Sequence, residues 1–309
     1  MTLEQLRIFA AVAEQLHVTR AATKLRLTQS AASAAIAAIE RRYATKLFLR
    51  VGRTIKLTDA GEVLLTAARV VLRDAADAER ALEELSGLKR GRIRIHASQT
   101  IANYWLPKRL LQFNSIYPQI TLLLTIGNSA QVEKAMIEGE ADLGLVEGDA
   151  EKSVLHPESI PGDRLVLVVG TQHPWFKRRH LDPSELGATK WVLREPGSGT
   201  RQVFESAARA MGVDPATLDV VMEFPSNEAV RSAVEAGAGA TVLSDLVVAS
   251  SLRYRALRAI ALPLPERDFT VLSHPERYQS KAQSAFLKMI LAERAIAPAG
   301  LSVEHSADA

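Results

Sequence analysis

One short segment in the second half of the chain combines residue types that suit ligand binding. It reads Arg194-Glu195-Pro196-Gly197-Ser198-Gly199-Thr200-Arg201 and leads into a predicted helix. Its glycines expose backbone N–H groups, its hydroxyls add donors, and the positive end of the helix dipole faces the loop. Arg201 and Arg194 supply full positive charges. The segment therefore predicts a small-anion site. A common turn with a helix cap would look the same, and Glu195 could compete with an anion or hold Arg201 in place.

Two other predicted strand-to-helix turns carry small polar side chains, at residues 97–100 and 126–129. Ligands of α/β proteins bind where such turns converge beyond the strand ends. The candidate ligand-binding residues are Ser98, Thr100, Asn128, Glu195, Ser198, Thr200 and Arg201, with Glu147 and Asn227 as further candidates.

Catalytic and metal-binding constellations are missing from the sequence. The seven histidines are scattered, and there is no Cys, no His-Glu-x-x-His, no Gly-x-Ser-x-Gly and no phosphate loop. His96 is the only histidine beside the predicted site, and we interpret it as a strand residue. We expect no enzyme activity, no cofactor and no metal.

Positive charge is concentrated at the N-terminus. Residues 1–58 contain ten Lys or Arg against three acids, a formal +7, whereas the remaining 251 residues hold 28 basic and 32 acidic side chains, a formal −4. A basic head on a mildly acidic body is typical of a polyanion-binding module attached to another domain.

Helical periodicity explains how this head could bind DNA. Apolar spacing predicts helices over 3–16, 20–26 and 29–42, with Thr19 and Thr28 as N-caps of the second and third. The last two form a helix-turn-helix, and the short side chains of the third would let it enter a major groove. Residues 47–58 predict a two-stranded wing that turns at Gly52. The candidate DNA-binding residues are Thr19, Arg20, Thr28, Gln29, Ser30, Ser33, Arg50, Arg53 and Lys56.

The head also resembles a known family. The run Leu6-Arg7-Ile8-Phe9, Thr19-Arg20-Ala21-Ala22, Thr28-Gln29-Ser30-Ala31, Lys46-Leu47-Phe48 and Leu57-Thr58-Asp59-Ala60-Gly61 is similar to the winged helix-turn-helix of LysR-type transcriptional regulators. The family often has Pro at the position of Ser30 and Arg-Gln at Ala34-Ala35, so its operator preference cannot be carried over. The 194–201 segment resembles the branch that regulates carbon fixation and sulfur assimilation, which implies an effector such as sulfite, sulfate, a phosphorylated metabolite or a carboxylate.

A long helix is predicted over residues 60–86. Apolar residues recur there at spacings of four and three, from Leu64 through Ala68 and Val71 to Leu82, which is typical of a coiled-coil seam. We expect this helix to form a homodimer, as the resemblance also implies. The alternative is that the stripe packs against its own domain.

From residue 92 the chain alternates strand and helix signals, which predicts α/β units with parallel sheets. The resemblance implies two Rossmann-like subdomains similar to a periplasmic binding protein, joined near Pro161-Gly162 and Arg267-Asp268. The predicted organisation is a winged helix-turn-helix at 1–58, a linker helix at 59–87, a hinge at 88–91, an effector domain at 92–296 (subdomains 92–161 with 269–296, and 162–268) and a disordered tail at 297–309.

These features predict a cytoplasmic transcriptional regulator whose partners are double-stranded DNA, a small-molecule effector and a second copy of the chain. A homotetramer and contact with RNA polymerase are further expectations. No membrane span is expected, because the apolar runs fall far short of about 20 residues. The alternative is a small-anion-binding protein or enzyme with an accessory DNA-binding head.

Overall fold

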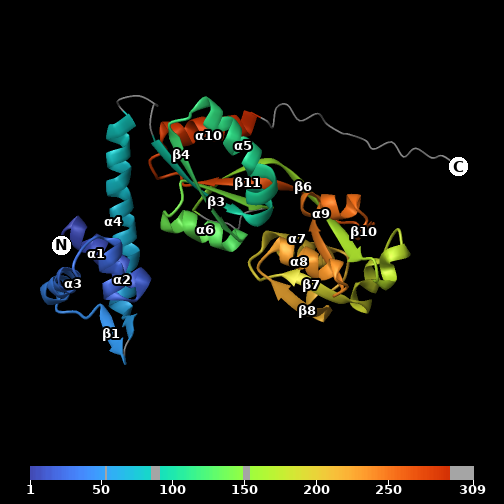
Figure 1. Ribbon diagram of the computed structural model, residues 1–309, viewed down its shortest axis with the longest axis horizontal. Helices are drawn as coiled ribbons and strands as arrows, with labels where there is room; N and C mark the ends of the chain where they lie inside the picture. Colours follow the sequence, from blue (N-terminus) through green and yellow to red (C-terminus); the bar gives the residue numbers. More distant parts are fainter. Residues whose placement is uncertain (53, 85–90, 149–153, 293–309) are drawn as a thin grey trace. The chain divides into compact units, whose positions relative to one another are not determined.

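The computed structural model describes residues 1–52, 54–84, 91–148 and 154–292 (Figure 1). Its internal contacts divide the chain into two units, Met1–Gly87 and Leu88–Ala309. The predicted hinge up to residue 90, the tail 297–309 and Arg53 lie outside the described residues. Within the described part, no helix combines the length and apolar composition needed to cross a bilayer.

The first unit is a helical head with a small wing and a long helix. Its elements are α1 (Leu3–Gln15), α2 (Val18–Lys24), α3 (Gln29–Tyr43), β1 (Phe48–Val51), β2 (Thr54–Leu57) and α4 (Asp59–Glu84). Thr28 caps α3 as predicted, since its hydroxyl accepts a hydrogen bond from the Ala31 N–H at 3.2 Å. The prediction that Thr19 caps α2 is wrong. His17 is the extended residue before the helix, and its Nδ1 accepts from the Arg20 N–H at 3.3 Å.

The core of the head joins α1, α3, the wing and α4. Phe9 is fully buried, and its ring lies 5.5 Å from that of Phe48 at the start of the wing. Ala68 of α4 is also fully buried in this cluster. The early part of the α4 stripe thus packs within its own unit, as the alternative interpretation held.

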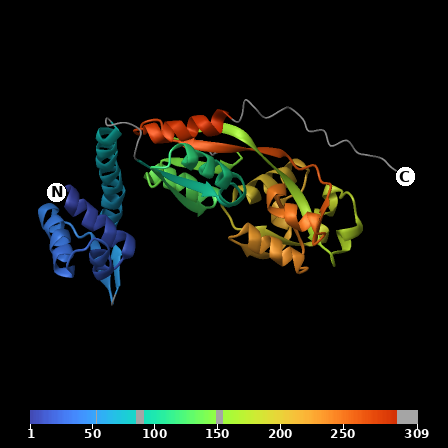
Figure 2. The same ribbon diagram turned by 45° about the horizontal axis from the view of Figure 1, so that its top comes forward.

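The second unit contains a nine-stranded sheet in the order β4-β3-β5-β11-β6-β9-β7-β8, with β10 paired to β6. The strands are β3 (Gly91–Ser98), β4 (Ile120–Gly127), β5 (Leu143–Glu147), β6 (His156–Gly170), β7 (Lys190–Arg194), β8 (Asp219–Phe224), β9 (Ala240–Ser244), β10 (Leu257–Ile260) and β11 (Glu266–Ser273). Neighbours β3, β4 and β5 run parallel, as do β7 and β8. The long strands β6 and β11 pair antiparallel and connect two lobes (Figure 2).

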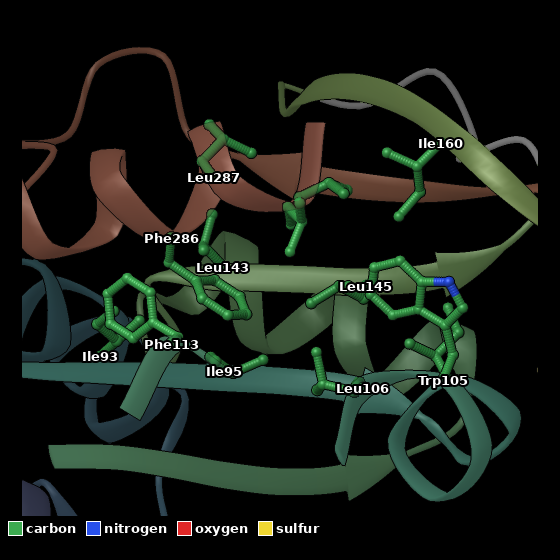
Figure 3. Packing of buried hydrophobic residues seen from close by; sticks show 14 of the residues in the cluster. Ile93, Ile95, Trp105, Leu106, Phe113, Leu143, Leu145, Ile160, Phe286 and Leu287 are labelled. Carbon is green, nitrogen blue, oxygen red and sulfur yellow. The ribbon is translucent and has the colours of Figure 1, made fainter. Parts of the chain in front are cut away.

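Helices cover both faces of each lobe. Lobe 1 (β3, β4 and β5) carries α5 (Leu106–Ile116) and α10 (Lys281–Ala292) in one apolar cluster and α6 (Ser129–Glu138) in another. Figure 3 shows Phe113 of α5 and Phe286 of α10 against the strand residues Ile93 and Leu143. Lobe 2 (β7 to β10) carries α7 (Gly199–Ala210) in one cluster and α8 (Asn227–Glu235) with α9 (Asp245–Arg253) in another.

The predicted fold class is confirmed, but some elements were missed or shortened. A π-helical turn (Ile101–Trp105) precedes α5, and α9 and β10 were not predicted. Strand β6 begins nine residues before the predicted strand at 165–169. Its first half was not predicted because it contains Pro157 and Pro161 and lacks alternation. At the crossing, Gly162 lies so close to β11 that an added Cβ would come 2.1 Å from the Arg267 carbonyl oxygen.

Candidate functional site

Polar side chains gather at the carboxyl ends of β3 and β5. Ser98 ends β3, Thr100 follows two residues later, and Glu147 ends β5; all three are buried. Since β3 and β5 are adjacent and parallel, their ends lie at the same edge of the sheet. The Ser98 hydroxyl is buried and forms no hydrogen bond with any described residue. A buried donor without a partner is rare, and each case calls for an explanation.

The first turn of α7 faces this edge. Its N-cap residue Ser198 makes no side-chain capping bond, so this side chain does not satisfy the first N–H groups, which have no intrahelical partner in any helix. Gly199 lies directly against lobe 1, because an added Cβ there would come 2.6 Å from Ser129 Oγ and 2.9 Å from the Glu147 carbonyl oxygen. Backbone donors at the positive end of a helix dipole thus face the end of β5.

A chain of hydrogen bonds joins the lobes beside these groups. The Asn227 amide donates to Thr100 Oγ1 at 3.1 Å, and Arg194 donates to Asn227 Oδ1 at 2.5 Å. Glu195 accepts two bonds from Arg194, at 2.8 and 2.9 Å, and one from Asn128 at 3.0 Å. Of the two roles considered for Glu195, the bond to Arg201 is not seen, because the carboxylate accepts from Arg194 and Asn128. Its hold on Arg194 is compatible with the other role, competition with an anion for that cation.

The prediction that Arg201 contributes a charge to this site needs correction. Its guanidinium donates to Glu205 at 2.7 Å, to Glu223 at 2.6 Å and to the Arg194 carbonyl at 2.9 Å. Burial alone would lower the pKa of Arg201, but the bonds to these two carboxylates outweigh it and raise that pKa. The cation is already neutralised by its neighbours, which its position in the sequence did not reveal.

A buried arginine that sequence reasoning missed lies at the crossing of β6 and β11. Arg267 donates to both carboxylate oxygens of Asp163, at 2.5 and 2.9 Å, and to Thr200 Oγ1 of α7 at 3.3 Å. Its side chain is 3% exposed and that of Asp163 is fully buried. Burial favours the neutral form, but the bonds to Asp163 and the charge of Glu147 prevail and raise the pKa of Arg267. The only signal was an arginine placed within a predicted lobe crossing.

One open cavity among the described residues lies beside this cluster and shares only Arg267 with it. A cavity of about 860 Å³ opens between the other side of α7 and the approach to β11, and it is lined mainly by apolar side chains, among them Val203, Met211 and Leu264. None of the seven predicted ligand-binding residues lines it. The polar cluster, where hydrogen bonds join the lobes and the Ser98 hydroxyl has no partner among the described residues, is the candidate site.

The exposed face of the head carries the residues predicted to contact DNA. Thr19, Arg20, Thr28, Gln29 and Ser30 are exposed, and Ser33 is half-buried. The Gln29 amide donates to Ser33 Oγ at 3.1 Å, and the hydroxyls of Thr28 and Ser30 lie 3.0 Å apart. These side chains, with only small residues beside them at Ala34 and Ala37, leave the start of α3 accessible to a groove.

Two basic residues of the wing are exposed as well. Arg50 lies on β1 and Lys56 on β2, and the antiparallel register pairs Arg50 with Ile55 and Leu49 with Lys56. Such side chains suit phosphate contacts, which position a protein on a duplex without reading sequence. Arg53, predicted for the same role, is the residue of the wing that the structure does not describe.

Comparison with known proteins decides the family. Residues 3–62 match the model of the bacterial regulatory helix-turn-helix protein, lysR family, and residues 86–295 match the LysR substrate binding domain. The chain belongs to the LysR family of transcriptional regulators. Family members are regulators rather than enzymes, in agreement with the expectation from the sequence.

Relatives of this LysR-type regulator extend over nearly the whole chain. The uncharacterized HTH-type transcriptional regulator YeiE of Escherichia coli is 33% identical, over 93% of this chain and 96% of its own. A probable RuBisCO transcriptional regulator of Synechocystis is 29% identical, over 98% of this chain and 90% of its own.

Two solved structures have related folds. Full-length CbnR complexed with its target DNA has a TM-score of 0.69 and 21% identity, covering 94% of this chain and 99% of CbnR. The CcmR regulatory domain of Synechocystis PCC6803 in complex with 2-PG has a TM-score of 0.61 and 27% identity, covering 66% of this chain and 98% of that domain.

Proposed function

We propose that this LysR-type regulator binds a small oxyanion between the two lobes and thereby changes how a dimer of the chain engages promoter DNA. The observation that carries the proposal is the buried Ser98 hydroxyl, which is without a partner among the described residues and lies at the sheet edge that α7 faces. Ser98, Thr100, Thr200 and the N–H groups of the α7 first turn are donors, which suits the oxygens of an anion. Arg267 lies beside these donors through its bond to Thr200 but is paired with Asp163, so the proposed contacts to the anion are hydrogen bonds from hydroxyl and backbone groups.

In the head, α3 would enter the major groove with Gln29, Ser30 and Ser33 at base edges. Gln29 can form a bidentate pair with adenine, and Arg50 and Lys56 would lie along phosphates. CbnR, a protein of similar fold, forms a complex with its target DNA, which supports DNA binding by the head without assigning individual residues.

Dimerisation would use the face of α4 that its own unit leaves uncovered. Val63 and Leu82 are 72% and 69% exposed, and Val70 and Val71 are exposed between them. Val71 and Leu82 continue the predicted seam along the helix from Ala68, whereas Val63 and Val70 lie one heptad apart on an adjacent side of the helix. Exposed apolar side chains in such a row favour a second copy of the helix, and two heads would then read a site with dyad symmetry.

Effector binding is coupled to DNA binding if closed lobes and open lobes favour different arrangements of the dimer or tetramer. The ligand would shift this equilibrium by as much as its affinity differs between the two states. The bonds from Asn227 to Thr100 and from Asn128 to Glu195 belong to the closed state, so they are the contacts that the ligand would reinforce.

A thermal-shift and calorimetry series with the full chain tests the site. We expect at least one of 2-PG, phosphate, sulfate, sulfite or a small carboxylate to raise the Tm of the wild type, because a ligand that binds only the native state stabilises it by mass action. Ser98→Ala should weaken that binding about tenfold through loss of one hydrogen bond. Ser250→Ala, at an exposed serine of α9, should not. An equal response of all three proteins would reject the site.

A mobility-shift assay with promoter fragments tests the DNA half of the proposal. Wild-type protein should retard its own promoter region at low salt, and the selected effector should change the pattern. Absence of any retardation with or without effector would contradict it.

A further inference from the structure

Glu147 is a buried carboxylate in the middle of the proposed oxyanion site. It is 5% exposed, and its backbone is fixed by antiparallel pairing with Phe269 of β11. Its side chain lies at the α7 first turn, since a Cβ added to Gly199 would come 3.0 Å from Glu147 Oε2. One hydrogen bond reaches the carboxylate from the described residues, from Ser129 Oγ to Oε2 at 3.1 Å. Carboxylates accept up to four bonds, so Glu147 can accept more.

The cations around Glu147 are already matched by other carboxylates. Arg267 gives two bonds to Asp163, and Arg194 gives two to Glu195. Arg267 is close enough to Glu147 for an attractive charge interaction, but no hydrogen bond joins the two side chains. An oxyanion that enters would therefore find many donors and one carboxylate acceptor. An oxyanion that presented only lone pairs to Glu147 would place acceptor against acceptor and leave the buried carboxylate short of donors.

We propose that Glu147 selects effectors that carry their own hydrogen-bond donor beside the oxyanion. This inference rests on the proposed function of the cleft. The class comprises oxyanions that retain a proton at neutral pH, such as inorganic phosphate, and small acids with a hydroxyl or ammonium group next to the carboxylate. Fully deprotonated anions such as sulfate are rejected. The donors of Ser98, Thr200 and α7 bind the oxygens, and the effector's own O–H or N–H binds Glu147.

Phosphate and sulfate form a suitable pair of probes, because both are tetrahedral anions of similar size and only phosphate keeps a proton at pH 7. Calorimetric titration of the full chain should show phosphate bound about 10- to 100-fold more tightly than sulfate, the usual cost of an unsatisfied buried acceptor. In Glu147→Gln the ratio should fall below about threefold, because the amide can donate as well as accept. Glu276→Gln removes an exposed carboxylate of the same unit and should keep the wild-type ratio.

The outcomes separate this inference from the proposed function. If the wild type binds both anions with a ratio below about threefold, or if Glu147→Gln leaves the ratio unchanged, the selective role of Glu147 is rejected and the cleft proposal stands. If no oxyanion binds the wild type, both are rejected. Should Glu147→Gln fail to fold, the ratio of phosphate to sulfate affinity in the wild type decides the question. A buried carboxylate acceptor predicts tighter binding of phosphate, and a ratio below about threefold would reject it.

Discussion

The DNA-facing surface of the head and the interior of the cleft use similar polar residues in opposite ways. In the head, Gln29, Ser30 and Arg50 are exposed and contribute little to their unit's packing. In the cleft, Arg267, Asp163 and Asn227 are buried and bonded to each other or to neighbouring elements. Mutations should therefore separate recognition from stability in the head, whereas in the cleft the two should change together.

The largest effect is expected for Arg267→Ala. Removal of the guanidinium leaves Asp163 buried and unpaired, which costs about 3–5 kcal/mol in the free energy of unfolding of the second unit. Urea denaturation followed by tryptophan fluorescence measures it, since the tryptophans at 105, 175 and 191 all lie in this unit. A loss below about 1 kcal/mol would show that the pair is not buried in solution.

Gln29→Ala tests the opposite behaviour in the head. We expect a loss of about 1–3 kcal/mol in discrimination at one base pair, with unchanged unfolding free energy. Binding to a set of single-base operator variants measures the first quantity and thermal denaturation the second. Equal weakening of binding to all operators would instead indicate that Gln29 contacts the DNA phosphate backbone.

Glu40 is an exception in the head, because it acts in packing rather than recognition. Its carboxylate accepts from Lys46 Nζ at 2.8 Å and from the Leu47 N–H at 2.9 Å. Burial alone would raise the pKa of Glu40, but these bonds prevail and hold it below its ordinary value of 4.5. The contribution to stability is present above pH 4.5 and is lost as the pH falls through the lowered pKa. Glu40→Gln should cost about 1.5 kcal/mol at pH 7 and flatten this acid-side loss, as pH-dependent denaturation would reveal.

Lys56→Ala should have the smallest effect. A phosphate contact carries no sequence information, so we expect weaker binding to all operators and a decrease of about 1 in the slope of log affinity against log salt. Stability should change by less than about 0.5 kcal/mol. A loss of affinity that depends on the operator sequence would instead indicate that Lys56 contacts base edges rather than phosphates.

The head was the more predictable region because its signals are local. The N-cap at Thr28 and the period of α3 depend on residues within one or two turns, and charge alone marked the exposed surface. The error at Thr19 was local too, because the helix begins two residues earlier than its apolar spacing suggested and His17 caps it.

The cleft was less predictable because its charge pairs join distant segments. The hydroxyl turns at Ser98 and Thr200 were visible in the sequence, since they follow strands. Which arginine faces them was not, because it depends on carboxylates far along the chain. Arg201 is neutralised by Glu223 of β8, and Arg267 is placed by a lobe crossing whose strands were predicted too short.

Gly199 sets a steric condition for closure. Any larger residue there would place its first side-chain carbon against both a hydroxyl and a main-chain oxygen of the opposite lobe, and the main-chain oxygen cannot swing aside. Homologous regulators with alanine or serine at this position should have separated lobes in the absence of ligand. They would then need a different conformational change to couple ligand binding to DNA binding. The identity of one residue thus offers a sequence criterion for sorting relatives by resting state before any of them is purified.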